Sequence, residues 1–264
     1  MKHISSAANP RYKSLRKLVQ SAQERRSTGL SVLDGVHLAA AYRECVGTPR
    51  SIAVSRTGLA NPEVRGLLEK MPVVEIIVLG DALFGALSSV ATPTGILAVV
   101  ETPRLRAVPQ RMDACAMLED LQDPGNLGSI LRSCAASGVG HVLLSKGSVH
   151  AWSPRVLRAG MGAHFALSIH EEADLVTAAQ HFEGTRLATQ ARAARAVFDV
   201  DLRGRIAFMF GNEGSGLSAR LLEAADAVVS IPMPGRAESL NVAAAAAVCL
   251  FERVRQLKTM RNEE

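Results

Sequence analysis

Three stretches of the sequence combine glycine or proline with polar and acidic side chains, as ligand-binding loops do. Residues 119–126 read EDLQDPGN, residues 210–217 read FGNEGSGL, and residues 231–241 read IPMPGRAESLN. Glycine allows positive φ and a close approach of backbone to a ligand. Amides, hydroxyls and carboxylates supply hydrogen-bond donors and acceptors that orient the ligand. The three stretches are therefore the candidate sites of chemistry.

Each loop alone also has an ordinary structural explanation. Asn126, and either Ser239 or Asn241, stand where the N-cap of a predicted helix belongs. Arg132 falls six residues after Asn126, on the second turn of that helix. Glu213 is less ordinary, because a carboxylate within a glycine-rich loop repels phosphate and favours a neutral or cationic ligand. The dinucleotide-binding GxGxxG and the phosphate-binding GxxxxGK[ST] are both missing from the sequence, which disfavours a dinucleotide-dependent oxidoreductase.

Metal and membrane chemistry find no support in the sequence. The four cysteines form no CxxC pair, and the histidines form neither HxxxH nor HExxH, so we expect no metal site. The longest apolar run, residues 242–251, is about half of what spans a bilayer. The first residues contain no apolar signal core. We therefore expect no membrane association and a cytoplasmic location.

Basic residues are concentrated at the start of the chain. The first thirty residues contain seven lysines and arginines against Glu24 alone, and the rest of the chain is nearly neutral. Such a cluster attracts polyanions, although it can also be a solvated helix face. With ten aromatic residues in all, contact with a nucleic-acid backbone is favoured over base stacking. The candidate RNA-binding residues are Arg11, Lys13, Arg16, Lys17, Arg25 and Arg26.

The apolar pattern predicts two α/β domains, residues 1–103 and 110–264, joined by a proline-containing linker at 102–109. In the first, a basic helix is expected over 10–26, followed by strands at 31–33, 52–54, 73–79 and 96–100 and helices at 37–44, 63–69 and 82–88. In the second, strands are expected at 114–118, 141–144, 165–169, 186–188, 206–210 and 227–231. They alternate with helices at 127–137, 154–159, 173–182, 219–225 and 242–258. Such alternation predicts a parallel sheet with its ligands in the loops after the strands.

Taken in order, DPGNLGSILR, FGNEGSGLS and IPMPGRAESLNVAAAAAV resemble the three motifs of the SpoU (TrmH-type) RNA ribose 2′-O-methyltransferases of the SPOUT superfamily. The second half of the chain resembles their catalytic domain. The first half, with NPRYK at 9–13, LDGVH at 33–37 and GILAVV at 95–100, resembles their ribosomal-protein-like substrate-binding domain. Many members have Glu-Gly where this chain has Asp34-Gly35.

The resemblance implies a fold that periodicity does not reveal. Members of this family have a deep trefoil knot in the parallel-sheet domain and act as homodimers. They bind S-adenosylmethionine in a bent form within the knot. On this pattern the cofactor is held, mostly through backbone groups, at Thr189, Gly211, Ile231 and Leu240.

The resemblance also assigns catalytic roles. Arg132 contacts the target nucleotide, either as the base or as a phosphate clamp. Asn126, Glu213, Ser239 and Asn241 match the other active-site positions. Glu213 is expected to orient Arg132 or its counterpart in the partner subunit, and Asn126 and Asn241 are expected to join the loops through amide hydrogen bonds. Ser239 is expected to contact the ribose or the methionine moiety.

The implied function is methyl transfer from S-adenosylmethionine to a ribose 2′-hydroxyl of RNA. We favour 23S ribosomal RNA over transfer RNA, because a separate N-terminal module of this kind accompanies many members that modify ribosomal RNA. Two alternatives stay open at this point: a transfer RNA methyltransferase, and a catalytically silent RNA-binding or ribosome-assembly protein of the same fold.

Overall fold

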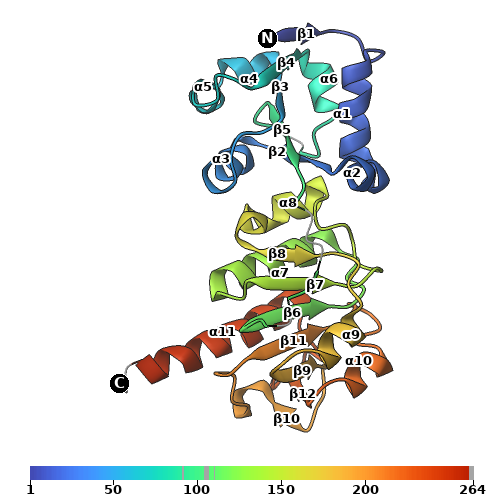
Figure 1. Cartoon of the computed structure of the whole chain (residues 1–264), viewed down its shortest axis with the longest axis vertical. Coiled ribbons are helices and arrows are strands. Elements are labelled where there is room, and N and C mark those ends of the chain that lie inside the picture. Colours follow the sequence, from blue (N-terminus) through green and yellow to red (C-terminus); the bar gives the residue numbers. More distant parts are fainter. Residues whose placement is uncertain (91, 104–106, 110, 262–264) are drawn as a thin grey trace. The chain divides into compact units, whose positions relative to one another are not determined.

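The chain folds into two compact units (Figure 1). The computed structural model describes residues 1–90, 92–103, 107–109 and 111–261, without the side chains of residues 260 and 261. Unit 1 consists of Met1–Arg104 and Trp152–Phe165, and unit 2 of Leu105–Ala151 and Ala166–Glu264. The predicted linker, 102–109, includes residues 104–106, which lie outside the described residues.

Segment 152–165 groups with unit 1 in its contacts, although it lies within the predicted second domain, 110–264. Trp152, together with Val156 and Leu157 of helix α8 (Pro154–Gly160), is buried. The Tyr42 ring meets the Phe165 ring edge-on, with 5.5 Å between centroids. Helix α8 also contacts the strand Leu30–Asp34 of unit 1.

Unit 1 is built on a five-stranded mixed sheet in the order β1-β4-β3-β5-β2. Strands β1, β4 and β3 are mutually parallel, and β5 is antiparallel to both β3 and β2. The strands are β1 (Lys2–Ile4), β2 (Leu30–Asp34), β3 (Ser51–Ser55), β4 (Glu75–Leu79) and β5 (Ile96–Glu101). The helices, besides α8, are α1 (Pro10–Gln20), α2 (Ala22–Thr28), α3 (Val36–Cys45), α4 (Arg56–Ala60), α5 (Pro62–Glu69) and α6 (Asp81–Gly85).

The basic helix predicted over 10–26 is two helices. Asn9 caps α1 by accepting a hydrogen bond from the backbone N–H of Arg11, and Ser21 separates α1 from α2. The Ser21 side chain accepts from the N–H of Glu24 and so caps the second helix. Leu15 and Leu18 of α1 are buried against the sheet. Because of this break, Arg25 and Arg26 belong to α2 and do not continue the surface of α1.

Unit 2 is a seven-stranded sheet in the order β10-β12-β9-β11-β6-β7-β8, and every strand pair in it is parallel. The strands are β6 (Ala114–Leu118), β7 (His141–Leu144), β8 (Ser168–His170), β9 (Thr185–Thr189), β10 (Arg195–Ala196), β11 (Ile206–Phe210) and β12 (Ala227–Ser230). The central strands β6 and β11 are buried along their whole length. This explains why they read as unbroken apolar runs rather than alternating ones.

Helices cover both faces of this sheet (Figure 1). They are α7 (Pro124–Ser137), α9 (Leu175–Gln180), α10 (Ala219–Glu223) and α11 (Val242–Arg261). Cys115 and Met117 of β6 share one core cluster with Leu175 of α9 and Leu221 of α10. Alternation along the strand sends the neighbouring side chains to the other face, where α11 packs against α7. The predicted α/β parallel-sheet class is confirmed.

Some local predictions were wrong or incomplete. The strand expected at 165–169 begins at Ser168, because residues 163–166 form a short 3₁₀ helix, η1 (Ala163–Ala166). Strand β10 has only two residues, and neither it nor η2 (Val197–Asp199) after it was expected. The short strand β1 and helix α4 of unit 1 were also missed. Elements this short carry too few residues to establish a period.

Candidate functional site

An open cavity of about 810 Å³ lies where the carboxyl ends of β9, β11 and β12 meet the start of α11. It is lined by Thr189 at the end of β9, Gly211 after β11, Ile231 after β12, and Leu240 and Asn241 before α11. All four predicted cofactor positions therefore line one cavity. This is the place that a parallel sheet provides for ligands, and the volume falls within the range of small-molecule sites.

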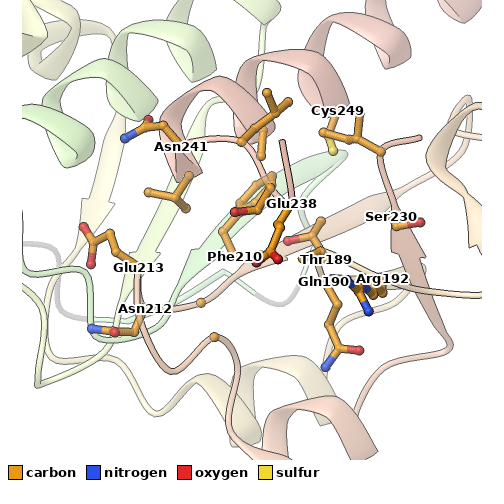
Figure 2. A pocket seen from close by; sticks show the side chains of 18 of the residues that line it. Thr189, Gln190, Arg192, Phe210, Asn212, Glu213, Ser230, Glu238, Asn241 and Cys249 are labelled. Carbon is orange, nitrogen blue, oxygen red and sulfur yellow. The ribbon is translucent and has the colours of Figure 1, made fainter. Parts of the chain in front are cut away.

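The cavity has two dissimilar sides. Figure 2 shows Glu213 and Asn241 at one side in that view, Gln190 and Arg192 at the other, and Glu238 between them. Its walls also include apolar side chains, namely those of Phe210, Val229, Ile231, Met233 and Leu240. The cavity thus combines apolar surface with polar and charged groups that can orient an organic ligand.

The glycine-rich loop is held closed by its own backbone. Asn212 and Gly216 exchange N–H···O hydrogen bonds of 3.1 and 3.0 Å, and Gly216 has a φ of +71°. A Cβ at Gly211 would lie 2.2 Å from the carbonyl carbon of Gly216, so any side chain there would force the loop apart. The Asn212 side chain accepts from the N–H groups of Gly214 and Ser215 and donates to the carbonyl of Asp120 at 2.7 Å. The loop is consequently stiff.

The three candidate loops are joined by side-chain amides. The Asn241 Nδ2 donates to Asn126 Oδ1 at 2.8 Å, and the Asn126 Nδ2 donates to Glu213 Oε1 at 3.0 Å. The prediction that Asn126 and Asn241 tie the loops together is confirmed. Residues 87 and 115 positions apart in sequence thus form one network, although each side chain belongs to a different loop.

Glu213 has partners other than the predicted Arg132. Besides the Asn126 amide, its carboxylate accepts from the backbone N–H groups of Gln122 and Asp123 at 3.4 and 3.3 Å. Burial raises the pKa of Glu213, but these hydrogen bonds outweigh it and hold the pKa below its ordinary value. Glu213 is therefore ionised at neutral pH and fixes the first loop. Among the described residues of one chain Glu213 makes no hydrogen bond or ion pair with Arg132, so its expected role of orienting Arg132 or the counterpart in a partner subunit stays a prediction.

Arg132 lies on the exposed side of α7 and does not line the cavity. Among the described residues its guanidinium has no hydrogen-bond or ion-pair partner. Ser239, in contrast, lines the cavity beside Leu240. The structure thus brings together Asn126, Glu213, Ser239 and Asn241, and leaves Arg132 facing outward.

The residues that cap α7 and α11 differ in part from those expected from the sequence. Asp123, rather than Asn126, is the N-cap of α7, because its side chain accepts from the N–H of Asn126 at 2.7 Å. Asn126 is thereby inside the first turn, with its amide free to bridge the loops. Asn241, not Ser239, caps α11 by accepting from the N–H of Ala243 at 2.9 Å. Its Oδ1 holds the helix while its Nδ2 holds Asn126.

A further connection, between Glu119 and Ser218, was not expected from the sequence. The Glu119 carboxylate accepts from both the N–H and the hydroxyl of Ser218, each at 2.7 Å. Asp120, which follows, has a φ of +52° and accepts from the hydroxyl of Ser145 at 2.6 Å. A Glu-Asp pair directly after a buried strand was the available signal, but its partners lie 99 and 25 positions away.

The Thr189 hydroxyl and the Cys249 thiol lie at the cavity, but neither is a reactive nucleophile. The Thr189 hydroxyl donates to the carbonyl of Met209 at 2.9 Å, which leaves mainly its backbone for a ligand. Cys249, which was not among the predicted site residues, lines the cavity. Burial raises the pKa of the Cys249 thiol to about 12, so it stays protonated and is a poor nucleophile. Further lining residues that were not predicted are Gln190, Arg192 and Glu238.

The N-terminal basic cluster is smaller than its composition suggests. Arg25 is buried, and its guanidinium donates to the carbonyls of Leu18 and Val19, so its assignment to RNA binding is wrong. Arg11 forms an ion pair with Glu75, and the amino group of Lys2 lies 3.1 Å from the same carboxylate. The Arg11 and Lys2 hydrogen bonds hold the pKa of Glu75 below its ordinary value.

Three of the predicted RNA-binding residues remain available on α1. Lys13, Arg16 and Lys17 are exposed and lie on one side of the helix, at spacings of three and four residues. We call them the α1 cations. Arg26 is exposed as well but takes part in an interaction within the chain. The α1 cations are the candidate nucleic-acid contact of unit 1.

Neither a metal cluster nor a membrane span is found in the part of the chain that the structure describes. No three of its His, Cys, Asp or Glu side chains lie together as a metal ion would need. Across the same residues, no helix has both the length and the apolar character of a membrane span.

Known proteins are similar to this chain in both sequence and fold. The family model for the SpoU rRNA Methylase family matches residues 113–251. The chain is 34% identical over 258 residues to an uncharacterized tRNA/rRNA methyltransferase of Synechocystis sp., covering 96% of this chain and 93% of that protein. It is 30% identical over 254 residues to the 23S rRNA (guanosine(2553)-2′-O)-methyltransferase RlmP of Bacillus subtilis, covering 95% and 98%.

A solved structure extends this likeness to three dimensions. The SpoU methyltransferase AviRb of Streptomyces viridochromogenes, in complex with the cofactor AdoMet, superimposes with a TM-score of 0.84 at 29% identity. The match covers 94% of this chain and 98% of that one, so it includes both units.

Proposed function

Because the chain belongs to the SpoU rRNA methylase family, we propose that it transfers a methyl group from S-adenosylmethionine to a ribose 2′-hydroxyl of 23S ribosomal RNA. The observation that carries the proposal is one cavity lined by the loops that follow β9, β11 and β12, with the first candidate loop, 119–126, joined to it through the hydrogen bond from Asn126 to Glu213. RlmP, named for a 23S rRNA target, matches the chain through unit 1 as well, which favours ribosomal over transfer RNA. The proposal places the protein in the cytoplasm with its substrate.

The cavity fits S-adenosylmethionine. Backbone groups near Thr189, Gly211, Ile231 and Leu240 can bind the polar edge of an adenine, and the cavity walls supply apolar surface for its ring. Glu213, ionised and fixed, suits a ligand with net positive charge rather than a dinucleotide phosphate. When bound, the cofactor supplies an electrophilic methyl group on a sulfonium. The trefoil knot that the family likeness implies belongs to the same proposal.

The chain's own contribution to the reaction is positioning. A ribose 2′-hydroxyl is a poor nucleophile, so holding it in line with the methyl group accounts for much of the rate. The Asn241–Asn126–Glu213 network keeps the loops at the mouth of the cavity in one arrangement. Ser239, which lines the cavity next to this network, is in position to hydrogen-bond the ribose or the methionine moiety.

We assign Arg132 to the phosphate beside the target ribose. A guanidinium keeps its proton in proteins, so it serves better as a clamp that stabilises the developing negative charge than as a base. Because Arg132 faces outward from its own cavity, we propose that it acts at the site of a partner subunit. Phe251 of α11, 47% exposed, is an apolar group that a homodimer through this domain would cover.

Methyl transfer to RNA tests the function directly. Purified protein is incubated with methyl-labelled S-adenosylmethionine and either 23S rRNA or a transfer RNA pool, and labelled riboses are mapped by primer extension. Label in 23S rRNA is expected. Label in transfer RNA alone would support the transfer RNA alternative, and cofactor and RNA binding without any label would support a silent RNA-binding protein.

Variants of Arg132 and Asn241 test the roles within the site. Arg132→Ala is expected to lower turnover by about a hundredfold or more, with the affinity for S-adenosylmethionine nearly intact. Mixing Arg132→Ala with Asn241→Ala should restore part of the activity, because a mixed dimer contains one site with both residues. Failure of the mixture, with exchange of subunits shown by mass spectrometry, would contradict a shared site.

A further inference from the structure

Two charged side chains of the cavity have no role in the network described above. Of the lining residues, Arg192, Glu213 and Glu238 carry charge, and Glu213 is occupied by Asn126 and the first loop. Arg192 and Glu238 are exposed. Within the described ranges, no hydrogen bond or ion pair joins either side chain to another residue. Both are therefore available to a ligand.

Arg192 and Glu238 approach the cavity from different elements. Arg192 is the third residue after the end of β9, and Glu238 belongs to the loop between β12 and α11. In Figure 2 Arg192 lies on the side of the cavity away from Asn241 and Glu213, and Glu238 lies between the two sides. A ligand that extends from the amide network towards Gln190 would meet Glu238 and then Arg192.

The charges of the cavity are the reverse of those of the cofactor. S-adenosylmethionine carries a sulfonium and an ammonium, both positive, and one carboxylate. The lining offers two carboxylates and one guanidinium. Arg192 is the single cation among these lining residues, and a guanidinium matches the planar geometry of a carboxylate.

We infer that Arg192 binds the carboxylate of the cofactor's methionine end and that Glu238 binds its ammonium group. The inference rests on the function proposed above and adds the residues that select the amino-acid end. An RNA phosphate is the other anion that Arg192 could meet. A carboxylate in the same cavity repels phosphate but suits a zwitterion, so the pair favours the cofactor.

Calorimetric titration in the absence of RNA can compare the affinities of ligands with and without the amino-acid end of the cofactor. The titrants are S-adenosylmethionine, S-adenosylhomocysteine, which keeps the amino-acid end, and 5′-methylthioadenosine, which lacks it. Arg192→Gln and Glu238→Gln should each weaken the first two ligands by about tenfold, the usual loss for a charge-assisted hydrogen bond. The affinity for 5′-methylthioadenosine should stay within about twofold. Arg192→Lys should recover part of the loss.

Arg220→Gln serves as the matched control, because Arg220 is exposed in the same unit and does not line the cavity. An equal loss for all three ligands in Arg192→Gln would indicate a general structural role and overturn the inference. Unchanged cofactor affinity would overturn it as well, and a loss of RNA binding instead would assign Arg192 to a phosphate. Failure of the unaltered protein to bind S-adenosylmethionine would refute the proposed function itself.

Discussion

Reversing the donor and acceptor between Asn126 and Glu213 tests whether their hydrogen bond holds the loops together. In Asn126→Asp, the Nδ2 that donates to Glu213 Oε1 at 3.0 Å becomes a carboxylate oxygen. The lost charge-assisted hydrogen bond costs about 1.5 kcal/mol. Repulsion between the two carboxylates adds about 1 kcal/mol, the value for a pair that solvent reaches. We expect a loss of about 2.5 kcal/mol in the free energy of unfolding.

The second substitution should repair part of the damage caused by the first. Glu213→Gln alone keeps an acceptor for Asn126 but loses one carboxylate oxygen that accepts from the backbone of the first loop, at a cost of about 1 kcal/mol. In the double variant, the new amide at position 213 donates to the new carboxylate at position 126, which still accepts from Asn241. We therefore expect the double variant to lie within about 1.5 kcal/mol of the unaltered protein, although additivity predicts about 3.5 kcal/mol.

Scanning calorimetry measures the effect, since about 1 kcal/mol shifts the midpoint of a unit of this size by about 2 to 4 °C. Asn126→Asp should lower the midpoint by about 5 to 10 °C, and the double variant should recover more than half of that. Asn126 does not line the cavity, so the result is independent of direct cofactor contact. A double variant that unfolds at a lower temperature than Asn126→Asp would refute the argument.

Three other predictions follow from the structure. Reversing the charge of the α1 cations should weaken RNA binding, and the slope of log affinity against log salt should fall by about 0.7 per lost phosphate contact. Arg25→Met, in contrast, should lower thermal stability but leave RNA affinity within about twofold in filter binding. Gly211→Ala should lower S-adenosylmethionine affinity by more than about tenfold in calorimetry, because its Cβ has no room; Gly214→Ala, with its nearest atom at 3.5 Å, is the control. Burial lowers the pKa of both His141 and His170, so below about pH 6.5 the unfolded chain binds more protons than the folded chain. Thermal stability should therefore fall as the pH drops below about 6.5, and His170→Phe should make this fall smaller.

Regular elements of unit 2 were predictable because their signals are local. Strands β6, β7 and β11 begin and end where the apolar runs do, and α7 and α11 contain the helices predicted at 127–137 and 242–258. Glycine and proline identified the loops for the same reason, since they constrain the backbone at their own position. The order of strands across the sheet is not local, and neither is the packing of segment 152–165 in unit 1.

The candidate site, too, was predictable only in part from the sequence. The resemblance of the three motifs to the SpoU family selected Asn126, Glu213 and Asn241 and implied that amides join the loops. Which atoms meet was decided by the fold: Glu213 reaches Asn126 rather than Arg132, and Glu119 reaches Ser218. Charge was predicted least well, because a sequence counts Arg25 as a surface cation until tertiary contacts bury it. Composition and short-range pattern thus determined the elements and the kinds of chemistry, whereas hydrogen bonds and ion pairs between distant positions depend on distances that only the folded chain sets.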